Sequence, residues 1–316
     1  MTPGVPAINE RPPSSVCLCV PTFRRPAGLR KLLEHIERLS YSELQSVIVV
    51  DNDAETRAGA TVAEEMARQF RIPLVCRVEP QRGHTYAYNN AFVAACRAVP
   101  APDFVAVLDD DEFPDPNWLT EMVRVALRYN VDIVGGPVFP VFDLPDHWLA
   151  KSGLYAPTRY ETGPVPMIYG AGSMLIRRAT LEQYLDEPFL HEFAFTGGGD
   201  EEFFHRCRRD GRSFAWADEA HVFETVPPSR ITTGYLLRRK FRSGGGATRV
   251  ERELFGAILG APRRFFKAAS LLGLGILSLP IAALRGRTAI MRSLFLTARG
   301  SGRIAAELGI LYEEYR

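Results

Sequence analysis

Short apolar runs alternate with amphipathic stretches in the first third of the chain, and this alternation restricts the fold more than any other feature. The runs are rich in β-branched residues, whereas the stretches between them carry apolar residues at helical spacing. The strand-like runs are residues 15–20, 46–50, 74–80 and 104–111, and the helical stretches are residues 27–39, 59–70 and 85–99. Strands that alternate with helices form βαβ units. The sequence therefore predicts an α/β fold with a mostly parallel sheet flanked by helices.

Polar residues stand after these runs. Ligands of parallel sheets bind at the carboxyl ends of the strands, so we expect Thr22, Asp51, Asp53 and Arg82 to lie along one edge. The fourth run ends in the adjacent acids of residues 109–112, whose repulsion costs stability unless something neutralises it. Mg²⁺ or Mn²⁺ on a substrate diphosphate would do so, because hard cations prefer carboxylate oxygens. A solvated turn before the helical stretch that follows is the alternative.

Composition limits the classes of protein and partner. The chain has 316 residues, 46% apolar and 24% charged, which suits one large or two small domains and is too polar for a polytopic membrane protein. Its 38 basic and 37 acidic residues nearly cancel, so we expect no nucleic-acid partner. Five scattered cysteines without a CxxC pair indicate reduced thiols. Residues 1–15 have four prolines and no apolar core, which excludes a cleavable secretory signal and predicts a cytosolic protein.

Five segments occur in an order typical of one enzyme family. They are PTFRRP (21–26), VIVVDND (47–53), QRGHTYAYNNA (81–91), LDDDEFPDPNWL (108–119) and GGGDEEFFHRCRRDG (197–211). Together they resemble inverting family 2 glycosyltransferases with the GT-A fold, over roughly residues 15–245. The details CVPTFRRP and VVDNDAE are similar to bacterial exopolysaccharide transferases of the succinoglycan type. The resemblance implies transfer of a sugar from a nucleotide-diphosphate donor, a UDP-sugar, with Mg²⁺ or Mn²⁺ as cofactor.

The resemblance also implies roles on the donor side. The backbone of Pro21 and Thr22 would hold the nucleotide base, together with Asp51 or Asp53. The alternative is that these two aspartates are turn formers.

The acids of the fourth run belong to the same donor site by this resemblance. Asp109 would contact the ribose side with Asp110 beside it, and Asp111 would bind the metal on the diphosphate. Arg82 would neutralise donor charge or, in the alternative, be a surface charge in a loop. The chain departs from the family here, because Tyr88 stands where the family often has an arginine.

The second acidic motif joins a glycine run to a helix start. An ordinary helix N-terminus explains its acids, because they complement the helix dipole. The resemblance implies instead that Gly198 and Gly199 bring the backbone close to an acceptor sugar and that Asp200 is the general base. The family pair at this position is Glu-Asp, and here it reads Gly199-Asp200. Glu201 or Glu202 would supply part of the missing charge.

Two further features follow this motif. His221 lies at the distance where the family often has a metal-binding histidine, although a lone histidine is more often structural. Residues 235–246 concentrate basic side chains before a flexible glycine run. They form either a solvated basic helix face or a loop that closes on the donor diphosphate, with Arg239 or Arg242 on its oxygens.

Residues 135–178 are rich in aromatics, proline and glycine and have weak periodicity. A partly aromatic groove suits a sugar acceptor, so Trp148, Tyr155 and Tyr160 are candidates for it, with core packing as the alternative for each. The segment GAGSMLIRR at its end predicts a strand that returns to the sheet.

The C-terminal region changes character. Ala268–Leu284 is an uncharged stretch of 17 residues with basic residues on both sides, at the short edge of the length that spans a bilayer. Small residues and Pro280 weaken a single spanning helix, so we expect a monotopic or dipping hairpin, with a buried core helix as the alternative. The protein would then lie at the cytoplasmic face of the inner membrane. This fits an acceptor that is a saccharide or a polyprenyl-diphosphate-linked saccharide.

The sequence divides into a flexible N-terminus (1–14), a GT-A domain (15–245) and a helical, membrane-associated region (246–316). The nucleotide-binding half of the GT-A domain would be residues 15–115 and the acceptor half residues 116–245.

Two rival functions remain. A sugar-phosphate nucleotidyltransferase also carries paired acids at a strand end, but it usually has a glycine-rich phosphate loop where this chain has PTFRRP. A non-catalytic carbohydrate-binding module would need neither a metal-type acidic cluster nor a base.

Overall fold

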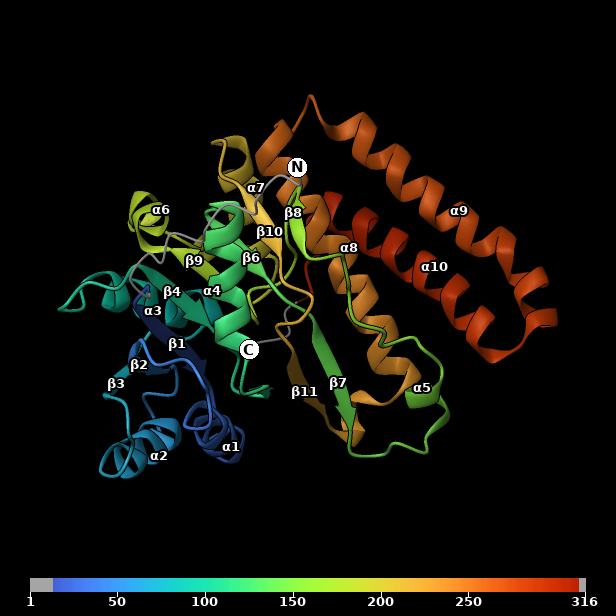
Figure 1. The fold of residues 1–316 in the computed structure, drawn as a ribbon. Helices are drawn as coiled ribbons and strands as arrows, with labels where there is room; N and C mark the ends of the chain where they lie inside the picture. The colour runs from blue at the N-terminus through green and yellow to red at the C-terminus, as the bar shows by residue number, and fades with distance from the viewer. Residues whose placement is uncertain (1–13, 313–316) are drawn as a thin grey trace, which may run out of the picture.

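A computed structural model of the chain describes residues 14–312. Apart from Ser14, the segment expected to form a flexible N-terminus lies outside the described residues. The order of elements begins with alternating strands and helices and ends with three long helices (Figure 1).

The centre of the molecule is an eight-stranded sheet with strand order β3-β2-β1-β4-β9-β6-β10-β8. Its strands are β1 (Val16–Thr22), β2 (Leu44–Asp51), β3 (Leu74–Val78), β4 (Phe104–Val107), β6 (Ile133–Gly135), β8 (Gly163–Val165), β9 (Met174–Arg177) and β10 (Phe214–Trp216). The first four strands are mutually parallel, and β10 is parallel to β6. Strand β9 is antiparallel to both of its neighbours. The predicted α/β fold with a mostly parallel sheet is confirmed, as is the returning strand at GAGSMLIRR.

Helices cover both faces of this sheet. They are α1 (Pro26–Ile36), α2 (Ala58–Ala67), α3 (His84–Cys96), α4 (Trp118–Tyr129), α6 (Arg178–Leu181) and α7 (Gly199–Arg209), whereas the short helix α5 (Trp148–Lys151) packs in a separate core with β11, α8 and α10. Successive side chains of a strand point to opposite faces. Leu18 and Val20 therefore join one core with α1, α2 and α4, whereas Cys17 and Cys19 join a second core with α3 and α7. The cysteine thiols of the described residues are free.

A smaller sheet continues from the acidic run. Its strands are β5 (Glu112–Pro114), β11 (Val222–Val226) and β7 (Val138–Phe142), in the order β5-β11-β7. Strand β5 is antiparallel to β11, with Glu112 opposite Glu224. The acids that follow β4 are therefore tied to a strand more than a hundred residues later.

Three long helices follow towards the C-terminus: α8 (Thr233–Phe255), α9 (Ala261–Arg285) and α10 (Arg287–Glu307). Figure 1 shows them on the opposite side of the molecule from β3 and α2. The prediction that the glycine run at residues 244–246 is flexible is wrong, because α8 is continuous through it. The expected domain boundary at residue 245 therefore falls inside a helix. Helix α9 likewise runs unbroken through Pro280.

Glycine has a packing role at these positions. A Cβ atom added to Gly302 of α10 would overlap the carbonyl oxygen of Phe241 in α8, and one added to Gly244 would overlap that of Arg299. Glycine therefore lets α8 and α10 approach backbone to backbone. Gly275 of α9 packs in the same way against Thr297 of α10.

We predict that Gly302→Ala lowers the free energy of unfolding by roughly 1–3 kcal/mol, because the added methyl group forces the two helices apart. Gly273→Ala is the matched control, since a Cβ atom there meets nothing within 4 Å. Alanine at that helical position should leave stability unchanged or raise it by up to about 1 kcal/mol. Urea unfolding of both variants measures the difference, and equal effects would contradict the packing role.

Candidate active site

The acidic run lies at the carboxyl edge of the main sheet, between β4 and β5. Strands β1, β2 and β4 are parallel and end at this edge, where Thr22 is the register partner of Asp51. The backbone N–H of Asn52 donates to the carbonyl oxygen of Thr22, 2.9 Å away. The structure therefore brings together the polar residues expected after the first, second and fourth strands.

Asp110 fastens the acidic run to the turn after β1. One carboxylate oxygen accepts from the hydroxyl of Thr22 at 2.8 Å and from the N–H of Phe23 at 3.2 Å, and the other accepts from Arg25 at 2.8 Å. The side chain is buried, with the residue 5% exposed. Burial raises its pKa, and the charge of Arg25 opposes that effect. Asp110 thus joins two loops and has little surface left for a ligand.

Asp111 reaches the surface between two arginines. Its carboxylate accepts from Arg25 at 2.8 Å and from Arg230 at 3.1 Å. Arg230 also pairs with Glu224 of β11 at 2.9 Å. Burial and the charge of Asp111 raise the pKa of Glu224. The repulsion within the acidic run is therefore offset by arginines that come from separate parts of the chain.

Asp109 is held by an uncharged partner. The hydroxyl of Tyr88 in α3 donates to its carboxylate, and the carboxylate of Glu112 accepts the N–H of Asp109 at 2.8 Å. Burial and the charge of Asp111 raise the pKa of Asp109 to about 7. Tyr88 is the residue that stands where the family often has arginine, so Asp109 receives a hydrogen bond without a counter-charge at that position.

Asp51 and Asp53 shape the turn after β2. The buried carboxylate of Asp51 accepts the N–H of Asp53 at 3.0 Å and that of Ala60, near the start of α2, at 2.8 Å. Hydrogen bonds from Arg24, at 2.9 Å, and from Thr56 lower the pKa of Asp53 to about 2. Both residues have the contacts of turn formers, and their expected contact with a nucleotide base stays a prediction.

The loop before α3 is tied to the same edge. The side chain of Asn52 donates to the carbonyl oxygens of Glu79 and Gln81 and accepts the N–H of Gly83. Arg82 is exposed in this loop, and its guanidinium lies 5.3 Å from the ring centre of Phe23. Arg82 thus lies at the rim where it was expected.

Helix α7 presents the second acidic motif. Gly197 and Gly198 before it have φ values of +72° and +97°, a conformation that favours glycine. Gly198 also packs against Phe193 and against Gly246 of α8, and Gly199 packs against Thr85. The two glycines expected at an acceptor therefore also have structural roles.

The three acids of this motif differ in their contacts. Glu202 is buried and pairs with Arg206 at 2.9 Å. Burial and the charge of Asp200 raise the pKa of Glu201. The carboxylate of Asp200 accepts no hydrogen bond and forms no ion pair with the residues that the structure describes. Burial and the charge of Asp109 raise the pKa of Tyr88, and Asp200 adds to this effect. Of the three acids, Asp200 is therefore the one whose carboxylate has no partner among the described residues. It lies on the side of the acidic run where Tyr88 lies.

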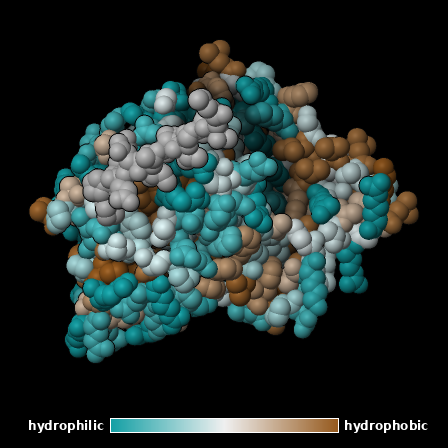
Figure 2. Space-filling view, in the orientation of Figure 1, coloured by the Kyte–Doolittle hydropathy of each residue, from teal (hydrophilic) through white to brown (hydrophobic). Residues whose placement is uncertain are grey.

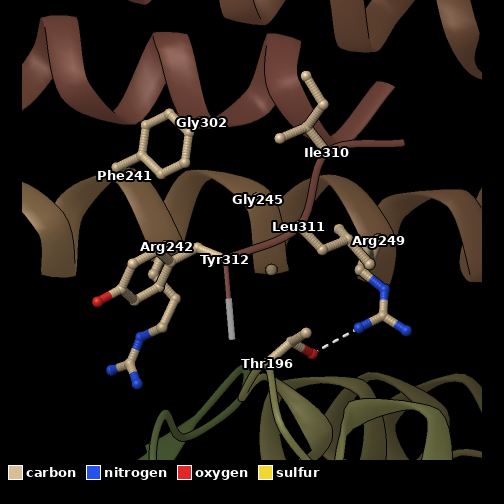
Figure 3. A pocket seen from close by; sticks show the side chains of 10 residues that line it. Thr196, Phe241, Arg242, Gly245, Arg249, Gly302, Ile310, Leu311 and Tyr312 are labelled. Carbon is tan, nitrogen blue, oxygen red and sulfur yellow. Dashed lines mark hydrogen bonds between the residues drawn. The ribbon is translucent and has the colours of Figure 1, made fainter. Parts of the chain in front are cut away.

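The basic residues of α8 face two parts of the site. Figure 3 shows Arg242, Gly245 and Arg249 on one side of α8, above Thr196 of the loop before α7. Arg249 donates to the hydroxyl of Thr196 at 2.5 Å. Arg239 lies near the acidic run, because its charge lowers the pKa of Glu224 against the larger effect of burial. The long helix thus reaches from the acidic run to the glycine run.

His221 does not lie beside Asp111, contrary to the prediction of a shared metal site. The carbonyl oxygen of His221 accepts the N–H of Asp115, whereas the carbonyl oxygen of Asp111 accepts the N–H of Thr225. His221 and Thr225 are four residues apart along the strand, so His221 lies about 13 Å from the position of Asp111, at about 3.3 Å per residue. The imidazole packs edge-on against Phe139. The antiparallel register of β5 and β11 instead brings Glu224 to the acidic run.

The aromatic candidates for the acceptor groove lie within residues 148–160. Trp148 is half-buried in a third core with α8 and α10. The hydroxyl of Tyr155 donates to the carbonyl oxygen of Arg230 at 2.7 Å, and Tyr160 packs edge-on against Trp216. Trp148 and Tyr155 thus share the third core, whereas Tyr160 packs elsewhere, and the acceptor role of Trp148 stays a prediction.

Sequence reasoning missed the cations of the site. Arg25, Arg230 and the acid Glu224 have no role in the sequence interpretation, yet they surround Asp111. The signal that points to them is charge balance, because adjacent buried acids need cations within reach.

The carboxylates of Asp111 and Glu224 fit a divalent cation that is held mainly by the phosphate oxygens of the substrate. Within residues 14–312, no three His, Cys, Asp or Glu side chains converge as a metal-binding group. Mg²⁺ typically takes one or two protein carboxylates together with phosphate oxygens and water. Asp111 and Glu224 are both partly exposed and share Arg230, so they match that mode rather than a closed protein cage.

We predict that the stability of the metal-free and nucleotide-free protein depends on pH through Asp109. An aspartate in the unfolded chain has a pKa near 4, whereas that of folded Asp109 is about 7. Between these values the folded protein binds a proton that the unfolded chain has released, so stability falls as pH rises. The stabilisation of Asp109→Asn over the wild type should therefore grow as pH rises from about 4 to 7. Thermal unfolding measures it, with the exposed Asp146→Asn as control, and a pH-independent difference would contradict the assignment.

Comparison with known proteins places this geometry in a family. A family model described as glycosyltransferase like family 2 matches residues 12–246. The succinoglycan biosynthesis protein ExoM of Rhizobium meliloti (strain 1021) is 30% identical over 282 residues, which cover 85% of this chain and 86% of that protein.

Solved structures share the fold. A mannosyltransferase, PcManGT of Pyrobaculum calidifontis in complex with GDP-Man and Mn²⁺, matches with a TM-score of 0.61 and 20% identity, over 94% of this chain and 87% of that one. Residues 1–349 of S. aureus TarS in complex with UDP match with a TM-score of 0.52 and 15% identity, over 96% and 93% of the two chains. The fold is GT-A, and the chain belongs to the family 2 glycosyltransferases.

Proposed function

We propose that this transferase moves a sugar, with inversion, from a UDP-sugar to a saccharide or lipid-linked saccharide in exopolysaccharide assembly. The observation that carries the proposal is the carboxylate of Asp200, which has no partner among residues 14–312 and lies on the Tyr88 side of an acidic run at the carboxyl edge of a parallel sheet. The similarity to ExoM supports the polysaccharide pathway. Family membership favours glycosyl transfer over nucleotidyl transfer and over a non-catalytic module.

The donor would lie along the edge formed by the ends of β1, β2 and β4. Pro21, Thr22, Asp51 and Asp53 would contact the nucleotide base, and Asp109 would face the ribose. The similar structures of TarS and PcManGT contain UDP and GDP-Man, respectively, which supports the proposal that a nucleotide binds at this edge.

The diphosphate would lie at Asp111. Asp111 would hold Mg²⁺ or Mn²⁺ with Glu224 beside it, and the bound cation would neutralise the charge of the leaving diphosphate. Arg230 is already within 3.1 Å of Asp111, so a small movement would let it pair with a diphosphate oxygen. Arg82, Arg239 and Arg242 would add positive charge from the rim and from α8.

Asp200 would act as the general base. Its carboxylate would accept the proton of the acceptor hydroxyl as that oxygen forms a bond to the anomeric carbon. The bond from the anomeric carbon to the diphosphate oxygen breaks on the opposite face, and the electron pair leaves with the nucleotide diphosphate. The configuration inverts because attack and departure are on opposite faces. Gly198, Gly199, Glu201 and Trp148 would border the acceptor.

We predict that Asp111→Asn weakens Mn²⁺-dependent UDP binding by about 10–100-fold, because the amide lacks the charge of the carboxylate. Asp115→Asn is the matched control, since Asp115 belongs to the same segment but bonds the N–H of Asn117 at 3.0 Å. Calorimetric titration with Mn²⁺ and with EDTA measures both. Wild-type affinity that is unchanged by EDTA would contradict the metal role, as would equal losses in the two variants.

We predict that Asp200→Asn lowers turnover by roughly 10²–10⁴-fold, because the amide cannot accept the proton. UDP binding and the melting temperature should stay close to wild type, since the loss of one helix-terminal charge costs about 1 kcal/mol or less. Glu201→Gln and Glu202→Gln are controls, and Glu202→Gln should lower stability through its lost pair with Arg206. Turnover is measured with donor and membrane acceptor. Retention of more than about a tenth of turnover in Asp200→Asn would exclude the base role.

We also propose that α9 binds the cytoplasmic face of the inner membrane. Within residues 14–312 it is the one helix long and apolar enough to cross a bilayer, and only 17% of its apolar window is buried. Leu274, Leu277, Ile281 and Leu284 form an exposed stripe at helical spacing. Figure 2 shows the hydrophobic surface gathered over α9 and the loop before it. Basic residues at both ends suit anionic headgroups.

We predict that the full chain sediments with vesicles containing phosphatidylglycerol and that Leu277→Glu with Leu284→Glu abolishes this, because charge on the stripe opposes burial among lipids. Val99→Glu is the control, since Val99 is 96% exposed outside the helices. A wild-type protein that stays in solution, or an equal loss in the control, would contradict the proposal.

A further inference from the structure

A cavity lies apart from the acidic run, between α7, α8, α9 and α10. It has a volume of about 300 Å³, which is enough for a small ligand group. Its lining includes basic side chains from both helices of the hairpin: Lys267 of α9 and Arg299 and Arg303 of α10, with Arg263 of α9. None of these residues has a role in the donor site. The cavity therefore needs an explanation of its own.

The charges of the lining are unbalanced. Four cations face the two acids Glu201 and Glu251, a net of +2, and burial lowers the pKa of the lining His205. Glu251 pairs with Lys267 at 2.7 Å and with one nitrogen of Arg303 at 3.2 Å. Arg299 forms no ion pair with any residue from 14 to 312. An anion would restore the balance.

Arg303 of the lining has unmet donors, and its neighbour Glu251 has an unmet acceptor oxygen. Arg303 is 6% exposed, and its Nε and Nη1 atoms are buried without a hydrogen-bond partner among the described residues. A buried guanidinium with unmet donors is costly, so such groups normally face an anion or water. Phosphate oxygens match the forked geometry of arginine.

Apolar side chains also line the cavity. Leu254 and Phe255 at the end of α8 line it, and Phe255 is 50% exposed. The following loop carries Ile258 and Leu259, which are 85% and 92% exposed. The lining thus combines basic side chains, of which Arg263 and Arg299 are exposed, with apolar ones close to the stripe of α9, a combination that matches a molecule with a charged head and a hydrocarbon chain.

We propose that this cavity binds the phosphate or diphosphate group of an amphiphile whose chain leaves over Phe255 and Leu259 toward the membrane. The inference rests on the proposed function and names the acceptor class for it, a lipid-linked saccharide. Glu201 lines the cavity and directly follows the proposed base, Asp200. A sugar attached to a phosphate held here would have to extend past the start of α7 to reach Asp200, which lies about 100° around the helix from Glu201.

The test uses the full chain with Mg²⁺ and saturating UDP, so that the donor site is filled. Farnesyl diphosphate, farnesol and inorganic diphosphate are titrated separately. Arg299→Ala should weaken farnesyl diphosphate binding by at least about 10-fold, because a charge-assisted contact is lost. Arg292→Ala is the matched control, since Arg292 is exposed two turns earlier in the same helix and does not line the cavity. It should bind like wild type.

Each outcome decides the proposal. Tight binding of farnesyl diphosphate that needs Arg299, with weaker binding of farnesol and of inorganic diphosphate, supports it. Equal binding of inorganic diphosphate means a simple anion site, and equal binding of farnesol means an apolar surface only; either overturns it. Equal losses in the two variants, displacement of the probe by UDP, or no binding also overturn it. If UDP itself does not bind, the proposed function fails. The dependence of farnesyl diphosphate binding on Arg299 still decides whether the cavity binds an amphiphile phosphate.

Discussion

The site depends on the neutralisation of the acidic run by two arginines. Arg25 lies at the start of α1 and contacts both Asp110 and Asp111, and Arg230 contacts Asp111 from the segment before α8. Without these contacts, adjacent carboxylates at a buried strand end would repel one another in a medium that screens poorly. The same contacts join the turn after β1, the end of β4 and the strand β11. The arginines thus hold together the edge at which the donor is proposed to bind.

Much of the fold was predictable because it depends on local periodicity. The four strands and three helices of the first 111 residues follow from apolar spacing, and the parallel sheet follows from their alternation. The gathering of Thr22, Asp51 and the acidic run at one edge follows in turn, because parallel strands end on the same side.

Other features were not predictable because they depend on partners distant in the chain. The pairing of Arg230 with Asp111 spans 119 residues. The register of β11 decides that Glu224, rather than His221, reaches the acidic run. The glycines of residues 244–246 resemble a flexible linker, and only the packing of α10 against Gly244 explains why they are helical. Local sequence cannot distinguish a glycine that frees the backbone from one that admits a neighbouring helix.

The central claim is that Asp111 and its arginines receive the diphosphate of a nucleotide together with a divalent cation. Crystals grown with UDP and Mn²⁺, measured at the manganese absorption edge, test it directly. The account predicts an anomalous peak within coordination distance of the Asp111 carboxylate, with Arg230 turned from Asp111 toward the diphosphate. Bound UDP with no manganese at Asp111, and with the pairs to Arg25 and Arg230 intact, would contradict it.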